Sequence, residues 1–185
     1  MSISTEVVGI DLSLTGTGLA RIGADGIEVG LFGAEGKRDA SLDERRTRIE
    51  TLAGEILDWV GSPLAALVES PSYNSSGGHA HDRSGLWWLV VTGLRTRGVA
   101  VAELAPATLK KYVTGKGTST KDAMIAATVR RFPDVDVNNN NVADALGLAC
   151  VASRLAGSPV DGELSQARQQ AYTTFLTKTG PFWGV

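Results

Sequence analysis

The chain has 185 residues, a formal net charge of −2, 43% hydrophobic and 21% charged residues, and one cysteine, Cys150. This composition is typical of a single globular domain with a full core, and a lone cysteine excludes an intramolecular disulfide and favours a reducing cytoplasm. No stretch approaches the roughly 20 apolar residues that a membrane-spanning helix needs, and no early apolar run resembles a signal peptide. The overall charge gives no support for nucleic-acid binding, which would have to rest on a local patch.

The first predicted element is an apolar strand that ends in one carboxylate, within VVGIDLSLTGTGLA from Val7 to Ala20. β-Branched residues favour a half-buried strand as far as Asp11, and Gly16 and Gly18 permit a tight turn beyond it. An acid within a hydrophobic strand is costly unless a cation compensates its charge. Asp11 is therefore either part of a metal site or a solvated acid that begins a turn.

Strands and helices alternate along the rest of the chain. Asp25-Gly26 indicates a β-hairpin, and Ser41 with Glu44 forms a capping box at the start of a helix. Further strands are predicted over 17–23, 27–34, 64–68 and 99–104. Helices are predicted over 42–60, 86–94, 107–113, 120–131, 142–155 and 164–175. Strands that first meander and then alternate with helices indicate a mixed sheet covered by helices.

The helix over 86–94 carries apolar residues on two sides. One stripe is Leu86, Leu89, Val90 and Leu94, and the other is Trp87 and Val91. A helix with two apolar sides lies either deep in the core of one chain or between the core and a partner subunit, and the sequence leaves both open. The preceding segment, Ser70–Arg83, is polar and glycine-rich and is predicted to be a loop.

The segment 100–131 is locally basic. It carries six basic and two acidic residues in a chain whose net charge is −2. The basic residues are Lys110, Lys111, Lys116, Lys121, Arg130 and Arg131. Ser119 with Asp122 is a capping signal for the helix that ends near Arg131. This charge predicts contact with a polyanion, unless the segment is only a solvated helical surface.

Three acids lie among hydrophobic residues at the ends of predicted elements: Asp11, Glu69 and Asp144. Asn141 lies three residues before Asp144 and shares its helix face. Carboxylates suit Mg²⁺, and a pair of such ions can stabilise the attacking and leaving oxygens of a phosphoryl displacement. The pattern predicts a metal-dependent site for phosphate chemistry.

Three segments resemble the RuvC family of Holliday-junction resolvases, in the RNase H-like superfamily. They are GIDLSLTGTGLA, LVES at 67–70, and PATLKKYVTGKGTSTKDAM followed by NNVADALGLA. The resemblance implies an α/β, RNase H-like fold with a mixed five-stranded sheet, three strands antiparallel and two parallel, flanked by helices and extended by a C-terminal helix. It implies a nuclease domain over residues 1–157 and a C-terminal helical extension over 158–185.

Carried over residue by residue, the resemblance implies catalytic, metal-ligating roles for Asp11, Glu69 and Asp144. Asn141 stands where the family usually has an Asp. An amide oxygen can bind Mg²⁺ but brings no charge, so one ion is expected to bind more weakly. The implied cofactors are two Mg²⁺ ions per active site, for which Mn²⁺ can substitute, and no nucleotide cofactor.

The resemblance also implies how DNA is held. It places DNA-contacting lysines at Lys110 and Lys121, and Lys116 lies in the glycine turn between them. Phosphate contacts fix a register without reading bases, which suits a branched shape. Tyr73 is the candidate for an aromatic that stacks at the junction centre, but its spacing from Glu69 departs from the family, and an ordinary surface tyrosine is the alternative.

The family acts as a homodimer, which implies an interface role for Trp87, Trp88 and Val91. The expected function is that of a cytoplasmic, structure-selective endodeoxyribonuclease of DNA recombination and repair, without membrane attachment. It would resolve four-way junctions by paired nicks that leave 5′-phosphate and 3′-hydroxyl ends. The compact size and the missing fourth acid suit a bacteriophage-type member.

Alternatives to this function remain. Asn141 favours a catalytically weak protein that binds branched DNA, and the superfamily also contains RNA-processing nucleases. An ATPase similar to actin or to sugar kinases is disfavoured, because those proteins need two such domains.

Overall fold

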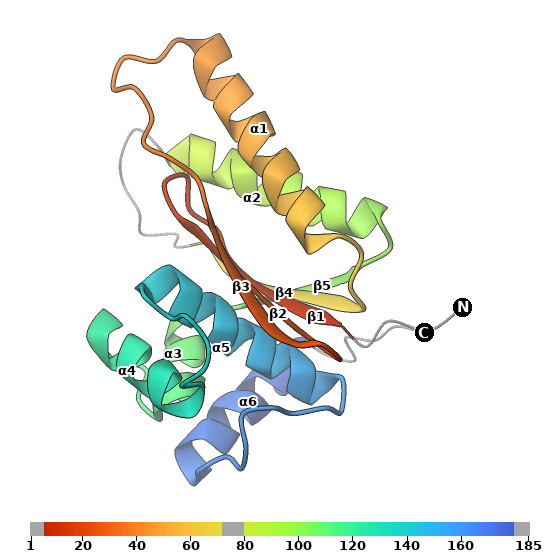
Figure 1. Ribbon diagram of the computed structural model, residues 1–185, viewed down its shortest axis with the longest axis vertical. Coiled ribbons are helices and arrows are strands. Elements are labelled where there is room, and N and C mark those ends of the chain that lie inside the picture. The colour runs from red at the N-terminus through yellow and green to blue at the C-terminus, as the bar shows by residue number, and fades with distance from the viewer. Residues whose placement is uncertain (1–5, 72–79, 180–185) are drawn as a thin grey trace.

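In the computed structural model, which describes residues 6–71 and 80–179, a mixed five-stranded sheet lies between two layers of helices (Figure 1). The strands are β1 (Val7–Asp11), β2 (Thr17–Gly23), β3 (Gly26–Phe32), β4 (Ala65–Glu69) and β5 (Ala100–Leu104). Their order is β3-β2-β1-β4-β5, with β1 to β3 antiparallel and β4 parallel to both β1 and β5. The predicted fold class is confirmed.

The helices divide into two groups. α1 (Leu42–Val60) and α2 (Ala80–Thr96) cover one face of the sheet (Figure 1). The other face carries α3 (Pro106–Thr114), α4 (Lys121–Arg131), α5 (Asn140–Leu155) and α6 (Gln166–Thr179). Successive residues of a strand point to opposite faces, so Val7 packs in the core beneath α3 to α6 while Val8 packs beneath α1 and α2. In the described ranges, no helix combines the length and apolar character needed to cross a membrane.

The starts of α2 and α4 differ from prediction for different reasons: α2 begins at a contact between distant segments, and α4 is capped by the neighbour of the predicted residue. α2 begins at Ala80, inside the predicted loop, and its first-turn Asp82 is held by two hydrogen bonds from the guanidinium of Arg45 on α1. α4 is capped by Thr120, whose side chain accepts from the backbone N–H of Ala123. The predicted cap, Ser119, donates its hydroxyl to the preceding turn instead. The predicted capping box of α1 is present.

A buried ionic network attaches α6 to α3 and α5. The side chain of Asp161, only 1% exposed, pairs with Arg154 at 2.5 Å and with Arg168 at 2.6 Å. It also accepts a hydrogen bond of 2.8 Å from the hydroxyl of Tyr112 on α3. Because burial of a carboxylate is tolerated only with such partners, the network fixes the position of α6 on the rest of the fold.

Candidate active site

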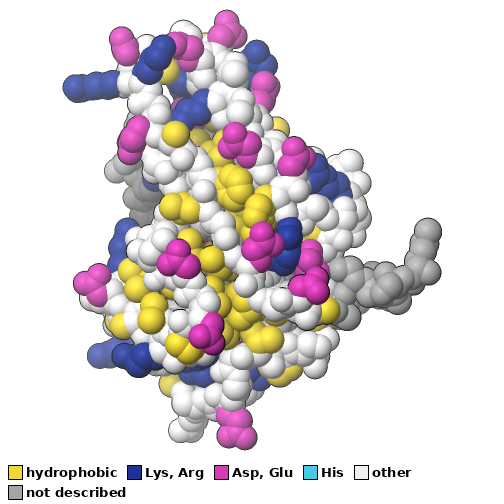
Figure 2. Space-filling view, viewed as in Figure 1, with side chains coloured by type: hydrophobic (Ala, Val, Ile, Leu, Met, Phe, Trp, Pro, Cys, Tyr) yellow, Lys and Arg dark blue, Asp and Glu magenta, His cyan; other side chains and the backbone are white. Residues whose placement is uncertain are grey.

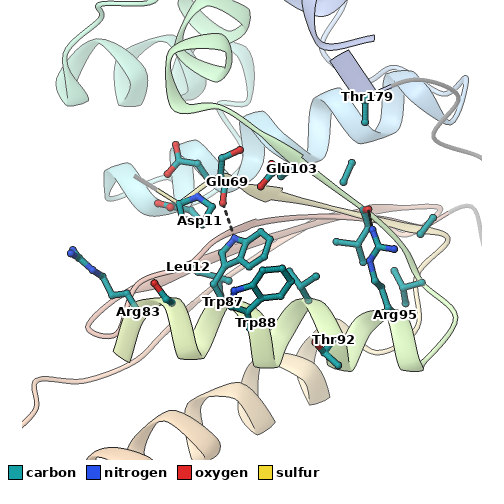
Figure 3. Close-up of a pocket in the computed structure, with 18 of the residues that line it drawn as sticks. Asp11, Leu12, Glu69, Arg83, Trp87, Trp88, Thr92, Arg95, Glu103 and Thr179 are labelled. Atoms are coloured by element: carbon teal, nitrogen blue, oxygen red, sulfur yellow. Dashed lines mark hydrogen bonds between the residues drawn. The ribbon is translucent and has the colours of Figure 1, made fainter. Parts of the chain in front are cut away.

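Asp11 and Glu69 lie next to each other because β1 and β4 run parallel. Ile10 is paired with Val68, and the following residues of the two strands are the two acids. The carboxyl ends of parallel neighbours meet at one edge of the sheet, and Figure 3 shows both side chains there together. Asp11 is 9% exposed, and its carboxyl group lies within hydrogen-bonding reach of that of Glu69. Two carboxyl groups can share a hydrogen bond only if one of them carries a proton.

Asp144 joins this pair because α5 lies directly on β1 and β2. A Cβ atom added at Gly9 would overlap the backbone of Ala145, and one added at Gly18 would overlap the backbone of Asn141. Only glycine allows so close an approach of helix to strand. The close approach at Gly18 is therefore to α5, and it brings Asp144 near Asp11.

Burial raises the pKa of all three carboxyl groups. The pKa of Asp11 rises to about 8, through burial and then through the neighbouring charge and hydrogen bond of Glu69. The pKa of Asp144 rises to about 7, through burial and then through the charge of Asp11. For Glu69, burial and the charge of Asp144 outweigh the hydrogen bond with Asp11 and the charge of Lys110, and its pKa is about 6. A bound cation would stabilise the ionised carboxylates and so lower these pKa values.

The donor atoms of the site fit a hard metal ion. Oδ1 of Asp144 is buried and has no hydrogen-bond partner among the described residues, which is costly unless a cation or water binds it. Oxygen ligands of this kind suit Mg²⁺. Within residues 6–71 and 80–179, no group of three His, Cys, Asp or Glu side chains already encloses an ion position. The three carboxyl groups are therefore close neighbours, but they do not form a complete set of ligands around one ion position.

The structure separates the three predicted DNA-binding lysines. Lys110 and Lys121 lie close enough to the acids for their charges to lower the pKa of Asp144. Lys121 also acts on Asp11 and Lys110 on Glu69. Lys116 has no such effect on the acids and lines a different hollow, between α3 and α4.

Asn141 lies beside the site, but its side chain is already engaged. Its amide nitrogen donates to the backbone carbonyl of Gly16, and its amide oxygen accepts a hydrogen bond of 2.6 Å from Asn140. Asn141 therefore joins the start of α5 to the turn between β1 and β2. Its role as a fourth metal ligand stays a prediction.

A cavity of about 1560 Å³ opens from the acids and runs along α2 and β5 (Figure 3). Trp87 lines it, and its indole nitrogen donates a hydrogen bond of 3.1 Å to the backbone carbonyl of Glu69. Arg83, in the first turns of α2, brings a positive charge to the same cavity. Neither the contact of Trp87 with Glu69 nor the place of Arg83 in the cavity was predicted from the sequence. Arg83 belonged to a predicted loop, and Trp87 was predicted only as an interface residue.

The outer side of α2 differs from the predicted stripe. Leu89, which was placed in one stripe with the fully buried Leu86, Val90 and Leu94, is 43% exposed, and Trp88 is 63% exposed. Val91 is buried and Trp87 is half-buried, so of the three predicted interface residues only Trp88 faces largely outward. Tyr73 lies outside the described residues.

Sequence relatives cover most of the chain. No protein-family model matches it. Crossover junction endodeoxyribonuclease RuvC of Hyphomonas neptunium is 31% identical over 159 residues, 84% of this chain and 95% of that protein. The protein of the same name from Pseudarthrobacter chlorophenolicus is 31% identical over 166 residues, 84% of this chain and 83% of the relative.

Solved structures share the fold. Thermus thermophilus RuvC has a TM-score of 0.58 and 21% identity, with 83% of this chain and 97% of the other covered. The same protein in complex with Holliday junction substrate has a TM-score of 0.59 and 19% identity, with coverage of 82% and 92%. The yeast mitochondrial Holliday junction resolvase has a TM-score of 0.54 and 13% identity, with coverage of 96% and 85%.

Proposed function

Because the chain belongs to the RuvC family of crossover junction endodeoxyribonucleases, we propose that it resolves four-way DNA junctions in the cytoplasm by paired, metal-dependent nicks. The observation that carries the proposal is the meeting of Asp11, Glu69 and Asp144, each with a raised pKa, next to two lysines. Such a site attracts a divalent cation and a polyanion together. The products would carry 5′-phosphate and 3′-hydroxyl ends.

We assign two Mg²⁺ ions, replaceable by Mn²⁺, to the three carboxylates, with the neutral Asn141 at the fourth position. Such ions, when bound, supply charge stabilisation to the phosphate and lower the pKa of the attacking water. The orphaned oxygen of Asp144 supports the assignment. Asn141 would reach the metal only by giving up its hydrogen bond with Asn140, so we expect the fourth position to bind weakly.

The chain's own residues position the reacting groups. The adjacent ends of β1 and β4 hold Asp11 and Glu69, and the hydrogen bond from Trp87 restrains the backbone of Glu69. Lys110 and Lys121 would hold the scissile phosphate and its neighbour beside the acids without reading bases. Tyr73 stays a prediction for stacking at the junction centre.

We further propose a homodimer, formed through the outer surface of α1 and α2. Trp88 and Leu89 are exposed there and border an apolar groove of about 470 Å³ that also includes Leu42 and Ile49. Adjacent exposed hydrophobic side chains are typical of an interaction surface. Multi-angle light scattering at micromolar concentration should give twice the chain mass, and Trp88→Glu should give the monomer.

The function is tested by incubating a labelled four-way junction with the protein and Mg²⁺, beside a linear duplex of the same sequence and a branched RNA. We expect symmetric nicks in the DNA junction alone, and Asp11→Asn should abolish them while junction binding persists. Equal cleavage by Asp11→Asn would contradict the proposed site. Binding without cleavage in either Mg²⁺ or Mn²⁺ would favour a branched-DNA-binding protein, and preferential cleavage of RNA would favour an RNA-processing nuclease.

A further inference from the structure

A second basic surface lies away from the acids, in an open hollow of about 590 Å³ between α3 and α4. Lys116 lies at one end, in the turn that joins the two helices, and Arg130 and Arg131 lie at the other, in the last turn of α4. At the lower left of Figure 2, where α4 lies in Figure 1, Lys and Arg side chains come to the surface. We name this feature the basic hollow.

Three cations of the basic hollow have no acidic partner within ion-pairing distance among the described residues. Within the part of the chain that the structure describes, no carboxylate forms an ion pair with Lys116, Arg130 or Arg131, whereas Arg45 and Arg46 of α1 have acidic partners. Arg131 is half-buried and donates a hydrogen bond of 3.2 Å to the carbonyl of Val113. That contact holds its guanidinium in place and leaves further N–H groups available.

The ionic network below the hollow adds to its positive charge. Arg168 lines the hollow and shares the single carboxylate of Asp161 with Arg154. Two guanidinium groups on one carboxylate leave one positive charge in excess. Burial and the charge of Arg168 lower the pKa of Arg131, so a bound anion would be favourable there.

The shape of the hollow suits an extended anion. Small side chains of α4 line it, including Ala123 and Ala126, together with Thr114 and Ser119. Methyl groups leave room for a chain to lie along the helix. The hydroxyl groups of Thr114 and Ser119 already donate to the backbone carbonyls of Lys110 and Lys116, so the polar contacts with an anion fall to the basic side chains. A compact metal ligand set is absent from the residues that line it.

The hollow is placed to meet DNA that leaves the active site. α4 begins at Lys121, beside the acids, and ends at Arg131, a separation of about 15 Å along the helix at a rise of about 1.5 Å per residue. Duplex DNA carries about one phosphate charge per 1.7 Å of its axis. An arm held at Lys121 therefore has phosphates within reach of Arg130 and Arg131 at the end of α4.

We propose that the basic hollow binds the phosphodiester backbone of one duplex arm of the junction, away from the scissile phosphate. This inference rests on the proposed function, since it assumes that the protein holds branched DNA. It assigns Lys116 to arm binding, together with Arg130 and Arg131, and leaves Lys110 and Lys121 at the cleavage site.

The test uses single charge reversals of exposed residues, Lys116→Glu and Arg130→Glu, in the full chain. Arg38→Glu is the matched control, because Arg38 is also exposed and lies before α1 on the far side of the sheet. Binding of a labelled four-way junction is measured by fluorescence anisotropy in Ca²⁺ across a range of salt concentrations, with arms shortened stepwise. Thermal melting checks that each variant is folded.

Each reversal in the hollow should weaken junction binding about five- to ten-fold and flatten the log–log salt dependence by about one, the loss of one phosphate contact. The difference from the parent should vanish with the shortest arms. Arg38→Glu should stay within about two-fold of the parent. If both hollow variants match Arg38→Glu at every salt concentration, the inference is wrong. If the parent itself does not bind the junction, the proposed function fails as well.

Discussion

The side-chain amide of Asn141 donates a hydrogen bond to the backbone carbonyl of Gly16. The residue that we propose as the fourth metal ligand therefore stabilises the turn after Asp11. An aspartate cannot donate this bond when ionised, and it would place a charge against the carbonyl.

Asn141→Asp should therefore lower the metal-free free energy of unfolding by about 1–3 kcal/mol, while Mg²⁺ should stabilise the variant more than the parent and reach half-maximal cleavage at a lower concentration. Urea unfolding with and without Mg²⁺, followed by a Mg²⁺ titration of cleavage, measures both effects. Asn141→Ala is the control, because it loses the bond and gains no charge. An equal Mg²⁺ response in all three proteins would remove position 141 from the metal site.

The raised pKa values make metal-free stability depend on pH. Asp11 and Asp144 keep protons in the folded protein up to pH values near 8 and 7, whereas in the unfolded chain they release them near 4. Because the folded state then binds more protons, the free energy of unfolding falls as the pH rises from about 4 to about 8.

Melting in EDTA should therefore give a lower Tm at pH 8 than at pH 6, and Mg²⁺ should restore stability most at pH 8. Asp11→Asn/Asp144→Asn should show a smaller decline. A Tm of the metal-free parent that rises over this range would contradict the assignment.

Lys121 should set the pH dependence of cleavage. Its charge lowers the pKa of Asp11 and of Asp144, so its removal should raise both values further. At limiting Mg²⁺, the acidic limb of the pH–rate profile of Lys121→Ala should move to higher pH. Lys116→Ala is the matched control, because Lys116 is not among the charges that act on the acids, and its profile should overlay that of the parent. A shift of equal size in both variants would show that the effect is one of DNA binding alone.

Trp87 should act on catalysis through Glu69. Trp87→Phe keeps an aromatic ring but loses the hydrogen bond to the carbonyl of Glu69. One hydrogen bond is worth about 0.5–1.5 kcal/mol, so kcat should fall about two- to ten-fold while junction affinity in Ca²⁺ is unchanged. Trp88→Phe, the exposed neighbour, should keep the parent kcat. A loss of affinity with unchanged kcat would assign Trp87 to DNA binding instead.

Gly9 should be intolerant of any side chain. Gly9→Ala places a methyl group against the backbone of Ala145 and Ala149, so α5 must move away from β1. We expect a loss of more than about 2 kcal/mol of unfolding free energy, measured by urea unfolding, and weaker Mg²⁺ binding as Asp144 separates from Asp11. Gly54→Ala in α1 is the control, since nothing lies within 4 Å of the added atom, and it should stabilise the protein by about 0.5–1 kcal/mol.

Local patterns predicted the sheet and its acids well. Asp11 and Glu69 each end a short apolar run, and a strand that ends in an acid can be recognised from the sequence alone. Asp144 stands out because its helix is otherwise apolar. The contacts that refine the site were not predictable, because they join distant segments: Asn141 and Gly16 are 125 residues apart.

Helix α2 shows most clearly what local sequence patterns do not predict. Periodicity identifies its apolar residues but cannot tell which side faces the sheet: it grouped Leu89, which is 43% exposed, with the buried Leu86 and Val90. The early start of the helix depends on Asp82 meeting Arg45 of α1, a contact that local sequence does not encode.

The Asp161 network has a consequence for local unfolding. α6 can leave the fold only if Arg168 gives up both Asp161 and the backbone carbonyl of Tyr112 on α3, and the buried carboxylate then loses one of its two cationic partners. α6 and α3 should therefore open as one cooperative unit. Since α3 carries Lys110, slow amide exchange near the end of the chain would report how firmly the protein holds the helix that we propose to bind DNA.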